Sequence, residues 1–531
     1  MAESDELVLI AGGGPTGLAA SLLLSRHGVR SLLVERRPGV SEHPKARGLN
    51  VRTLELFRVW GLEPAVRAAA AGLERAVDVA WGPTLAGPET RRVRYGGAGE
   101  QGQADSPTGS VGCAQDKLEQ VLLDAARSYP LGELRFGHEL TSVARDDEGV
   151  TAAITERASG RETIVRASYL IAADGAASPI RSRAGIAMAG PGVLAHRIGI
   201  YFRADLAEVA ATRPALLYWV GPPDGAAVLA PVNLADLWLL MVPFRPEHGE
   251  ATGDLTDERC VQLVRAACGI PDLAVELLSV LPWQMAAATA ERFRDGRVFL
   301  AGDAAHLIPP AGGQAMNVGI QDVHNLAWKL AAHLKGWAGG ALLDSYEAER
   351  RPVALAITRD AAANVAAGSG GRRPEQFSNR GRVLGVSYDS AAVIPDGTDL
   401  PAVGNPVTDY CTTARPGSRA PHIWLCRDGQ RLSTLDLYDS GFALLAGASG
   451  QAWCAAAQET AKPLGIPISC HLVGPDGPLT DRAGEWPGLY GVQSDGAVLV
   501  RPDGHVAWRR DRSAPDPVSE MASVFRRVLS I

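Results

Sequence analysis

Three glycines near the N-terminus have the spacing that binding of a pyrophosphate requires. Gly12, Gly14 and Gly17 follow a short apolar stretch that is typical of a buried strand. A tight turn favours glycine at the first position, close approach of a phosphate favours it at the second, and close packing of helix on strand favours it at the third. Glu35 follows Gly17 at roughly the twenty-residue distance at which an acid binds a ribose hydroxyl. The spacing predicts a dinucleotide site with contacts from Gly12, Gly14, Pro15, Thr16, Gly17, Glu35 and Arg36.

Two further carboxylates come directly after later apolar stretches. Asp174 precedes Gly175, and Asp303 follows Gly302. A carboxylate at the end of a strand can accept strong hydrogen bonds from ribose or ribityl hydroxyls. Each pair alone also fits an ordinary turn or a helix cap. The loop after Asp303 would let backbone approach a flat ring and place helix amides beside a negative charge; its candidate residues are Pro310, Gly312, Gly313, Met316 and Asn317.

The elements that would position these residues alternate between strands and helices. Residues 15–27 have the apolar spacing of a helix, and residues 31–34 predict the next strand. Residues 134–173 are typical of a meander with polar turns, and residues 186–284 predict a separate sheet. Short strands and turns after residue 401 predict a further small α/β domain.

Composition excludes several classes of protein. The 531 residues suit two or three domains, and a net charge of −7 argues against general nucleic-acid binding. The seven cysteines are scattered without a C-x-x-C pair, so we expect reduced thiols, no disulfide framework and no metal site. The acidic N-terminus does not resemble a signal peptide, and no apolar run is long enough for a membrane span. These features predict a cytoplasmic protein with no membrane partner.

In this order the motifs resemble those of the FAD-dependent aromatic hydroxylases, the single-component (class A) flavoprotein monooxygenases. The resemblance covers residues 1 to about 365. It implies that the glycine turn and Glu35 hold the ADP part of FAD, and that Asp303 binds the ribityl chain. It also implies contacts to FAD from Arg47 and Gln115, a place near the pyrophosphate for Asp174-Gly175, and a flavin ring lined by residues 310–317. Ala315 departs from the family, where many relatives have glycine.

The C-terminal part resembles the extension of aromatic polyketide and phenol hydroxylases. The resemblance rests on three stretches, residues 415–422, 433–437 and 499–509. It implies a thioredoxin-like fold, but the absence of C-x-x-C removes the redox pair and leaves a structural or interfacial role.

We therefore expect an α/β protein in which a mainly β domain is inserted into a Rossmann-like domain and a thioredoxin-like domain follows. The FAD-binding domain would comprise residues 1–80, 111–185 and 285–370, and the substrate-binding sheet residues 81–110 and 186–284. Residues 371–400 would be a linker, and residues 401–531 the thioredoxin-like domain.

The resemblance implies that the protein uses NADPH or NADH and O₂ to hydroxylate a polycyclic aromatic polyketide or related phenol through a flavin C4a-hydroperoxide. Nicotinamide would bind transiently, because only one glycine fingerprint is present. Baeyer–Villiger insertion, epoxidation or inactivation of an antibiotic stays open on the same scaffold. A FAD-linked reductase and a flavin-binding protein without catalysis are further alternatives. A homodimer is left open.

Catalytic and substrate-binding residues are harder to place. Tyr218, on a predicted strand of the inserted sheet, is a candidate base, with a packed core tyrosine as the alternative. Arg47 is a candidate for binding substrate as well as FAD, with a plain phosphate-binding or surface role as the alternative. For His306 a structural role is favoured. An apolar substrate pocket is expected from Phe202, Tyr218, Trp219, Trp238 and Met241, with ordinary sheet core as the alternative.

Overall fold

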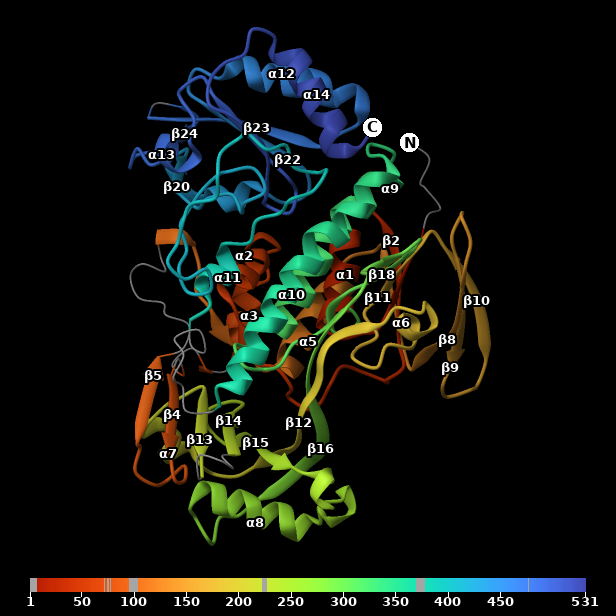
Figure 1. The fold of residues 1–531 in the computed structure, drawn as a ribbon, viewed down its shortest axis with the longest axis vertical. Helices are drawn as coiled ribbons and strands as arrows, with labels where there is room; N and C mark the ends of the chain where they lie inside the picture. The colour runs from red at the N-terminus through yellow and green to blue at the C-terminus, as the bar shows by residue number, and fades with distance from the viewer. Residues whose placement is uncertain are drawn as a thin grey trace.

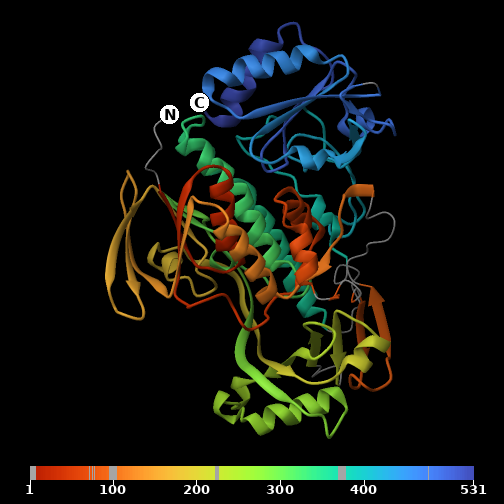
Figure 2. The same ribbon diagram turned by 180° about the vertical axis from the view of Figure 1, so that it is seen from behind.

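The computed structural model describes residues 7–70, 72–73, 76, 78–94, 104–221, 227–368, 378–475 and 477–531. A mainly parallel sheet with helices lies in the middle of the molecule (Figure 1). A sheet covered by helix α8 (Asp257–Cys268) lies at one end, and the C-terminal α/β part lies at the other. The view from behind shows the same order (Figure 2). The predicted α/β class is confirmed.

The central sheet carries the glycine turn. Its order is β17-β18-β11-β1-β2-β7, and every neighbouring pair is parallel except β17 and β18. Helices α1, α5 and α9 pack together beside it, so its inner strands, β18, β11, β1 and β2, are mostly apolar and buried. The elements are β1 (Leu7–Ala11), β2 (Arg30–Glu35), β7 (Gly132–Phe136), β11 (Tyr169–Ala172), β17 (Arg294–Asp295), β18 (Val298–Leu300), α1 (Pro15–Arg26), α5 (Gln115–Arg127), α9 (Ala315–Leu334) and α10 (Ser345–Ala366).

The predicted meander over residues 134–173 is only partly correct. Strands β8 (His138–Arg145), β9 (Val150–Glu156) and β10 (Glu162–Ala167) form an antiparallel meander. The outer strands, β7 and β11, instead join the parallel sheet beside β2 and β1. For β11 the reason is burial, since all four of its residues are buried and need cover on both faces.

The inserted sheet has the order β19-β16-β12-β15-β14-β13-β4-β5. Helix α8 packs its buried residues, among them Cys260, Val264 and Cys268, against one face of this sheet. Of the glycine- and proline-rich residues 82–110, the structure places Gly82 and residues 91–94 in this sheet, and 95–103 lie outside the described residues. The strands are β4 (Asp78–Gly82), β5 (Arg91–Arg94), β12 (Met188–Arg203), β13 (Leu217–Val220), β14 (Ala227–Pro231), β15 (Leu237–Phe244), β16 (Glu276–Ala290) and β19 (His306–Leu307).

Strands β12 and β16 connect this sheet to the middle of the molecule. They are 16 and 15 residues long and pair along almost their whole length (Figure 1). Their register shifts near the end that adjoins the central sheet, between Ala189 and Gly192 and between Val193 and Ala195. Gly190 and Gly192 have φ of 147° and 78° there, a region that favours glycine.

The C-terminal part has a sheet of order β21-β20-β24-β23-β22-β25-β26. Strand β22 (Phe442–Gly447) runs parallel to β23 (Ile468–Gly474) with helix α12 (Gln451–Ala461) between them in sequence. The antiparallel pair β25 (Ala497–Val500) and β26 (Val506–Arg510) and helix α14 (Pro517–Leu529) follow. This β-α-β, β-β-α order matches the predicted thioredoxin-like fold. The remaining strands are β20 (Trp424–Arg427), β21 (Gln430–Ser433) and β24 (Leu479–Thr480), and the remaining helix is α13 (Trp486–Tyr490).

Helix α9 joins the C-terminal part to the rest of the core. Trp328 and Trp337 belong to the same apolar cluster as Phe442 of β22, and the rings of Trp328 and Phe442 meet edge to face at 5.9 Å. The smaller elements are α2 (Val51–Val59), α3 (Glu63–Ala69), α6 (Pro179–Arg183), α7 (Ala207–Thr212), α11 (Arg380–Leu384), β3 (Gly48–Leu49) and β6 (Val111–Gly112). In the described part of the chain, no helix combines the length and apolarity that crossing a bilayer needs.

Candidate functional site

The predicted glycine turn lies at the carboxyl end of β1. Gly12 has a φ of 106°, and a Cβ on it would lie 2.2 Å from the carbonyl oxygen of Ala173. A Cβ on Gly17 would lie 1.9 Å from the Gly12 oxygen, so both positions require glycine. A Cβ on Gly14 would meet no protein atom within 4 Å. The chain therefore leaves open space at the one glycine where a phosphate is expected to approach.

The first turn of α1 presents backbone donors to this space. Pro15 begins the helix, Gly14 caps it without a side-chain hydrogen bond, and the first intrahelical bond comes from Leu18 N to Gly14 O at 3.0 Å. Amides before that bond have no intrahelical partner, which makes a helix N-terminus suitable for an anion. Thr16 packs against the next turn of the site, because its Oγ1 lies 2.6 Å from a Cβ built on Gly302.

Glu35 ends β2 beside the same turn. Its Oε2 accepts a hydrogen bond from Gly13 N at 2.7 Å, and its Oε1 accepts two from Arg37 at 2.9 Å. Burial opposes ionisation, but these hydrogen bonds hold the pKa of the Glu35 carboxyl below its ordinary value. Arg36 is exposed. Contact of Glu35 or Arg36 with a ribose stays a prediction.

Asp303 lies at the carboxyl end of β18, on the same edge of the sheet. Its side chain is exposed, yet the surrounding protein desolvates the carboxyl and raises its pKa against the charges of His306 and Lys45. A carboxyl that solvent can reach but that protein atoms surround is typical of a group inside a cleft. Within the described residues, no hydrogen bond reaches this carboxylate. It is therefore available to a ligand hydroxyl.

Asp322 of α9 holds the Asp303 turn in place, and sequence reasoning assigned it no role. Its carboxylate accepts hydrogen bonds from Gly302 N at 3.1 Å, from His306 Nε2 at 2.7 Å and from Arg350 Nε at 2.8 Å. Burial opposes its ionisation, but His306 and Arg350 hold the pKa of the Asp322 carboxyl below its ordinary value. In the sequence, an acidic residue inside an otherwise apolar helical stretch is the feature that could have identified Asp322. His306 is buried on this carboxylate, which fits its favoured structural role.

The loop before α9 forms the far end of the edge. Gly312 and Gly313 have φ of 117° and 64°, and Gly313 N donates to Pro310 O at 3.0 Å. The side chain of Asn317 is used within the protein, since its Nδ2 donates to Gly48 O at 2.8 Å and its Oδ1 accepts from Asn50 N at 2.9 Å. What remains for a ligand is the backbone of the loop and the first turn of α9.

Asn50 is a second residue that sequence reasoning left without a role. Its Nδ2 donates to Gln314 Oε1 at 2.9 Å, and its Oδ1 caps α2 by accepting from Thr53 N. It thus ties residues 48–50 to the loop before α9, beside the predicted contact Met316, which is buried. Asparagine just before a helical stretch was the available signal.

Asp174 and Gly175 have a local structural role. The Asp174 carboxylate accepts hydrogen bonds from Ser178 Oγ at 2.7 Å and from Ile180 N at 3.3 Å, and burial raises its pKa. Gly175 has a φ of 86°. Arg181 then donates to Ala304 O at 3.0 Å, which connects this turn to the one that carries Asp303. Direct contact of Asp174 with FAD stays a prediction.

Arg47 and Gln115 lie between the central and inserted sheets. Arg47 is buried, its Nη1 donates to Pro231 O of β14 at 2.8 Å, and burial lowers its pKa to about 10. Gln115 holds the loop that carries Arg47, since Gln115 N donates to Ala46 O at 2.8 Å and its Oε1 accepts from Ala46 N at 3.2 Å.

The structure places the candidate base and three of the candidate pocket residues in the core of the inserted part. Phe202, Tyr218 and Trp238 belong to the core between the inserted sheet and α8. The Tyr218 hydroxyl donates to Arg213 O at 2.6 Å and accepts from Ala215 N at 3.0 Å, while burial raises its pKa to about 12. Side chains alternate along a strand, so these three point away from the face that Trp219 and Met241 share. These contacts favour the packed core tyrosine, and a catalytic role of Tyr218 stays a prediction.

The opposite face of the inserted sheet adjoins the FAD-binding region. Tyr201, Leu239 and Met241 form a small apolar cluster with Ala114, which precedes α5. His43 lies on this face, where its Nδ1 is 2.7 Å from Ser279 Oγ and its ring meets Tyr201 edge to face. Burial, with the charge of Lys45, lowers the pKa of His43 to about 4. No sequence pattern singled out His43 or Tyr201.

Together these residues fit a flavin dinucleotide laid along one edge of the sheet. The carboxyl ends of β2, β1, β11 and β18 are neighbours and supply Glu35, the glycine turn, Asp174 and Asp303. Parallel α/β sheets bind ligands at this edge. Along this edge an acid comes first, followed by an anion-binding turn, a free acid and a backbone-lined loop. In the same order, these features fit the ribose, the pyrophosphate, the ribityl chain and the flat ring of a flavin dinucleotide.

Comparison with known proteins agrees with this geometry. Residues 5–361 match the family described as FAD binding domain, and residues 413–530 match the family described as aromatic-ring hydroxylase, C-terminal. The chain is 43% identical to a putative polyketide hydroxylase of Streptomyces halstedii, over 98% of this chain and 96% of the relative.

Solved structures are similar over the whole length. The flavin-dependent monooxygenase PieE, in complex with FAD and substrate, has a TM-score of 0.92 at 37% identity, with 99% of each chain covered. Aklavinone-11 hydroxylase, in a ternary complex with FAD and aklavinone, has a TM-score of 0.90 at 39% identity, with 100% of each chain covered. The matched families and the geometry of the sheet edge lead to the same conclusion: the chain belongs to the FAD-dependent aromatic-ring hydroxylases.

Proposed function

We propose that the protein is a monooxygenase that uses FAD, NADPH or NADH, and O₂ to hydroxylate a polycyclic aromatic polyketide or a related phenol. The observation that carries the proposal is the full-length likeness to aklavinone-11 hydroxylase, whose structure contains FAD and aklavinone. The unpaired cysteines support action in the cytoplasm, where thiols stay reduced.

The residues of the sheet edge would divide the binding of FAD among them. The open space at Gly14 and the first turn of α1 would receive the pyrophosphate, Glu35 the ribose, and Asp303 a ribityl hydroxyl. The backbone of residues 312–317 would lie against the flavin ring. When bound, FAD supplies the electron transfer and oxygen chemistry that no side chain can perform.

The rest of the site must position the substrate and exclude water. The apolar face with Tyr201, Leu239 and Met241 would receive the fused rings, because it adjoins the FAD-binding region and the α8 face does not. Arg47 is a positioning candidate for FAD or substrate, since it is buried between the two sheets and makes a hydrogen bond to Pro231 O. A dry site keeps the oxidising equivalent from being lost to solvent.

Ligand-stimulated turnover tests the proposal. The FAD-loaded protein is mixed with NADPH and O₂, with and without a polycyclic phenol such as a hydroxyanthraquinone, and products are identified by mass and by NMR. We expect faster NADPH oxidation with the phenol and a product that carries one more oxygen on a ring carbon. A lactone or an epoxide would favour the alternative oxygenations. Turnover of equal rate without O₂ would instead indicate a reductase.

A further inference from the structure

A group of charged side chains is fully buried where α2, α9 and α10 meet the C-terminal part. We call it the interdomain charge cluster. Its cations are Arg52, Lys329, Arg350, Arg419 and Arg501, and its carboxylates are Glu55, Asp322, Glu349 and Asp503. Among the described residues, the cluster thus has one cation more than carboxylates. Burial of an uncompensated charge is costly, so the position of this excess matters.

Two parts of the cluster are balanced. Arg350 Nε lies 2.8 Å from Asp322 Oδ1, which makes one pair. Arg501 Nη1 lies 2.6 Å from Glu349 Oε1 and also pairs with Asp503, while Lys329 Nζ lies 2.7 Å from Glu349 Oε2. These two cations and two carboxylates compensate each other.

The excess charge falls on the third part, where two guanidinium groups share one carboxylate. Glu55 receives Arg52 Nη1 at 3.0 Å and Arg419 Nε at 2.9 Å. Arg419 also donates from Nη2 to Glu55 Oε1. The other donors of the two arginines go to uncharged oxygens: Asp503 O at 2.8 Å for Arg52, and Asp105 O at 2.9 Å and Tyr410 Oη at 3.2 Å for Arg419. Carbonyl oxygens satisfy hydrogen bonds without neutralising the charge.

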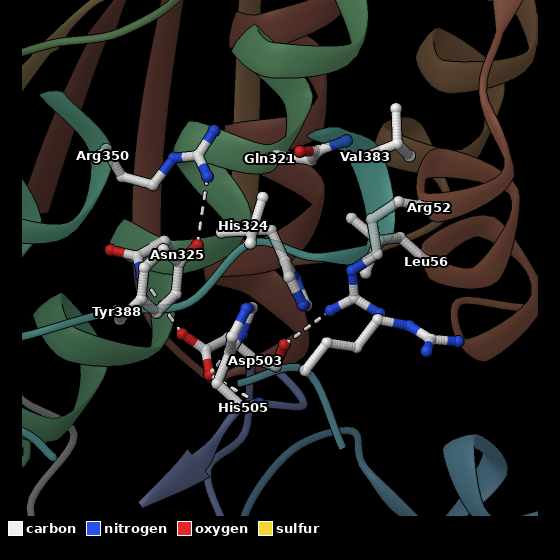
Figure 3. Close-up of a pocket in the computed structure, with 12 residues that line it drawn as sticks. Arg52, Leu56, Gln321, His324, Asn325, Arg350, Val383, Tyr388, Asp503 and His505 are labelled. Atoms are coloured by element: carbon white, nitrogen blue, oxygen red, sulfur yellow. Dashed lines mark hydrogen bonds and ion pairs between the residues drawn. The ribbon is translucent and has the colours of Figure 1, made fainter. Parts of the chain in front are cut away.

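Both arginines line a narrow cavity together with two histidines. Figure 3 shows the rings of His324 and His505 turned toward each other, with the Arg52 guanidinium beside them. His324 is 9% exposed and His505 is 5% exposed. His505 Nδ1 is 3.6 Å from Asp503 Oδ1, beyond hydrogen-bond distance. Within the described residues, neither nitrogen of His505 and not Nδ1 of His324 has a hydrogen-bond partner.

The histidines do not supply the missing negative charge, but they do supply donors. Burial, together with the charge of Arg52, lowers the pKa of His324 to about 3 and that of His505 to about 4, so both are neutral at pH 7. A neutral imidazole has one N–H and one lone pair. An unpaired donor inside the protein is costly unless a water or an ion occupies the space beside it.

We propose that this cavity binds one small inorganic anion, such as chloride, between Arg52, Arg419 and the two imidazoles. An anion neutralises the shared excess charge and accepts the unused N–H groups, whereas a water molecule does only the second. The cavity has room for about one water-sized group, so a monatomic halide is closer to it in size than a polyatomic oxyanion is. The site holds α2 against the C-terminal part and is independent of the proposed reaction.

Bromide provides a direct test on the unmodified, FAD-saturated protein. Crystals grown with sodium bromide in place of sodium chloride should give an anomalous peak in the cavity between Arg52 and His505. A cavity filled by water, or by a carboxylate of the chain itself, would overturn the proposal. This measurement needs no variant, so it does not depend on a mutated chain that folds.

Thermal unfolding tests whether the bound anion stabilises the folded protein. At constant ionic strength, replacement of gluconate by chloride should raise the Tm by about 2 °C and then saturate, because chloride binds only the folded cavity. An anomalous peak without this rise would indicate an adventitious ion only and would also overturn the proposal.

Two variants on α2 separate this site from general salt effects. Arg52→Met leaves Arg419 paired with Glu55 and should abolish the chloride-dependent rise in Tm. Arg58→Met is the matched control, because Arg58 also links α2 to the C-terminal part, by a pair with Asp436 at 2.8 Å, but lies outside the cavity. It should keep the chloride dependence. Loss of the dependence in both variants, or in neither, would contradict the site.

Discussion

The carboxyl edge of the central sheet and the interdomain charge cluster treat their carboxylates in opposite ways. Desolvation raises the pKa of Asp303, and no hydrogen bond from the described residues relieves it. Glu349 is desolvated as well, but Arg501 and Lys329 surround it and hold the pKa of its carboxyl far below the ordinary value. Both regions contact α9, so the difference lies in the partners. An acidic side chain without hydrogen-bond partners indicates a place for a ligand. An acidic side chain with several cationic partners indicates a contact between two parts of the protein.

The largest effect is expected at the glycine turn. Gly12→Ala forces a side chain onto a φ of 106° and against the oxygen of Ala173. We expect purified Gly12→Ala to contain no FAD and to recover none on reconstitution, measured by the flavin absorbance per protein.

Gly14→Ala is the matched control for that experiment. A methyl group at Gly14 meets no protein atom, so the unfolding midpoint of the FAD-free protein should not change. FAD affinity should still fall by about tenfold, because the methyl group occupies the space of the phosphate. An unchanged affinity would place the pyrophosphate elsewhere.

The second-largest effect is expected in the interdomain charge cluster. Glu349→Gln leaves Arg501 and Lys329 without their shared carboxylate and should cost about 3–5 kcal/mol in the free energy of unfolding, measured by urea denaturation. Since the pKa of Glu349 is lowered on folding, its contribution in the unmodified protein is present above the pKa of the unfolded chain and is lost as the pH falls. The control is Glu459→Gln, on the exposed side of α12. It should change neither the free energy of unfolding nor its dependence on pH.

A third effect should appear at Asp303 with the opposite dependence on pH. Its pKa is raised on folding, so the FAD-free protein should lose stability as the pH rises through that pKa, and Asp303→Asn should remove this loss. The same variant should weaken FAD binding by about 10- to 100-fold, as expected for a lost hydrogen bond to a charged group. Titration calorimetry measures the FAD affinity, and thermal scans at several pH values measure the stability.

Asp272→Asn serves as the control for Asp303→Asn, because Asp272 is exposed on the inserted part. It should leave both FAD affinity and the pH profile unchanged. If Asp303→Asn binds FAD as tightly as the unmodified protein, the assignment of this acid to the ribityl chain is wrong.

The smallest effect on activity is expected at Tyr218. Tyr218→Phe loses two hydrogen bonds to residues 213–215 and should cost about 1 kcal/mol of stability. The kcat with a phenolic substrate should change less than about twofold, whereas loss of a general base lowers rates by about 10²–10⁴. A fall in kcat of that size, with a shifted pH profile, would instead support Tyr218 as the base.

The sequence was sufficient where structure depends on neighbours in the chain. Gly12, Gly14 and Gly17 predict strand, turn and helix, because each glycine has a local reason. It was insufficient where partners are distant. The pairing of β11 with β1 is invisible in the apolar stretch alone, and the face that Tyr218 occupies depends on where α8 packs. The ion pair of Glu55 and Arg419 joins residues 364 positions apart, with no pattern in either segment.

Strands β12 and β16 form the long two-stranded ribbon between the central and inserted sheets (Figure 1). Its register breaks are all but one at the end beside the central sheet, where Gly190 and Gly192 also lie. The hydrogen bonds between the two strands stiffen such a ribbon against bending, so it bends most easily where the ladder is interrupted. The interrupted ladder and the two glycines therefore make this end the part of the ribbon that resists bending least.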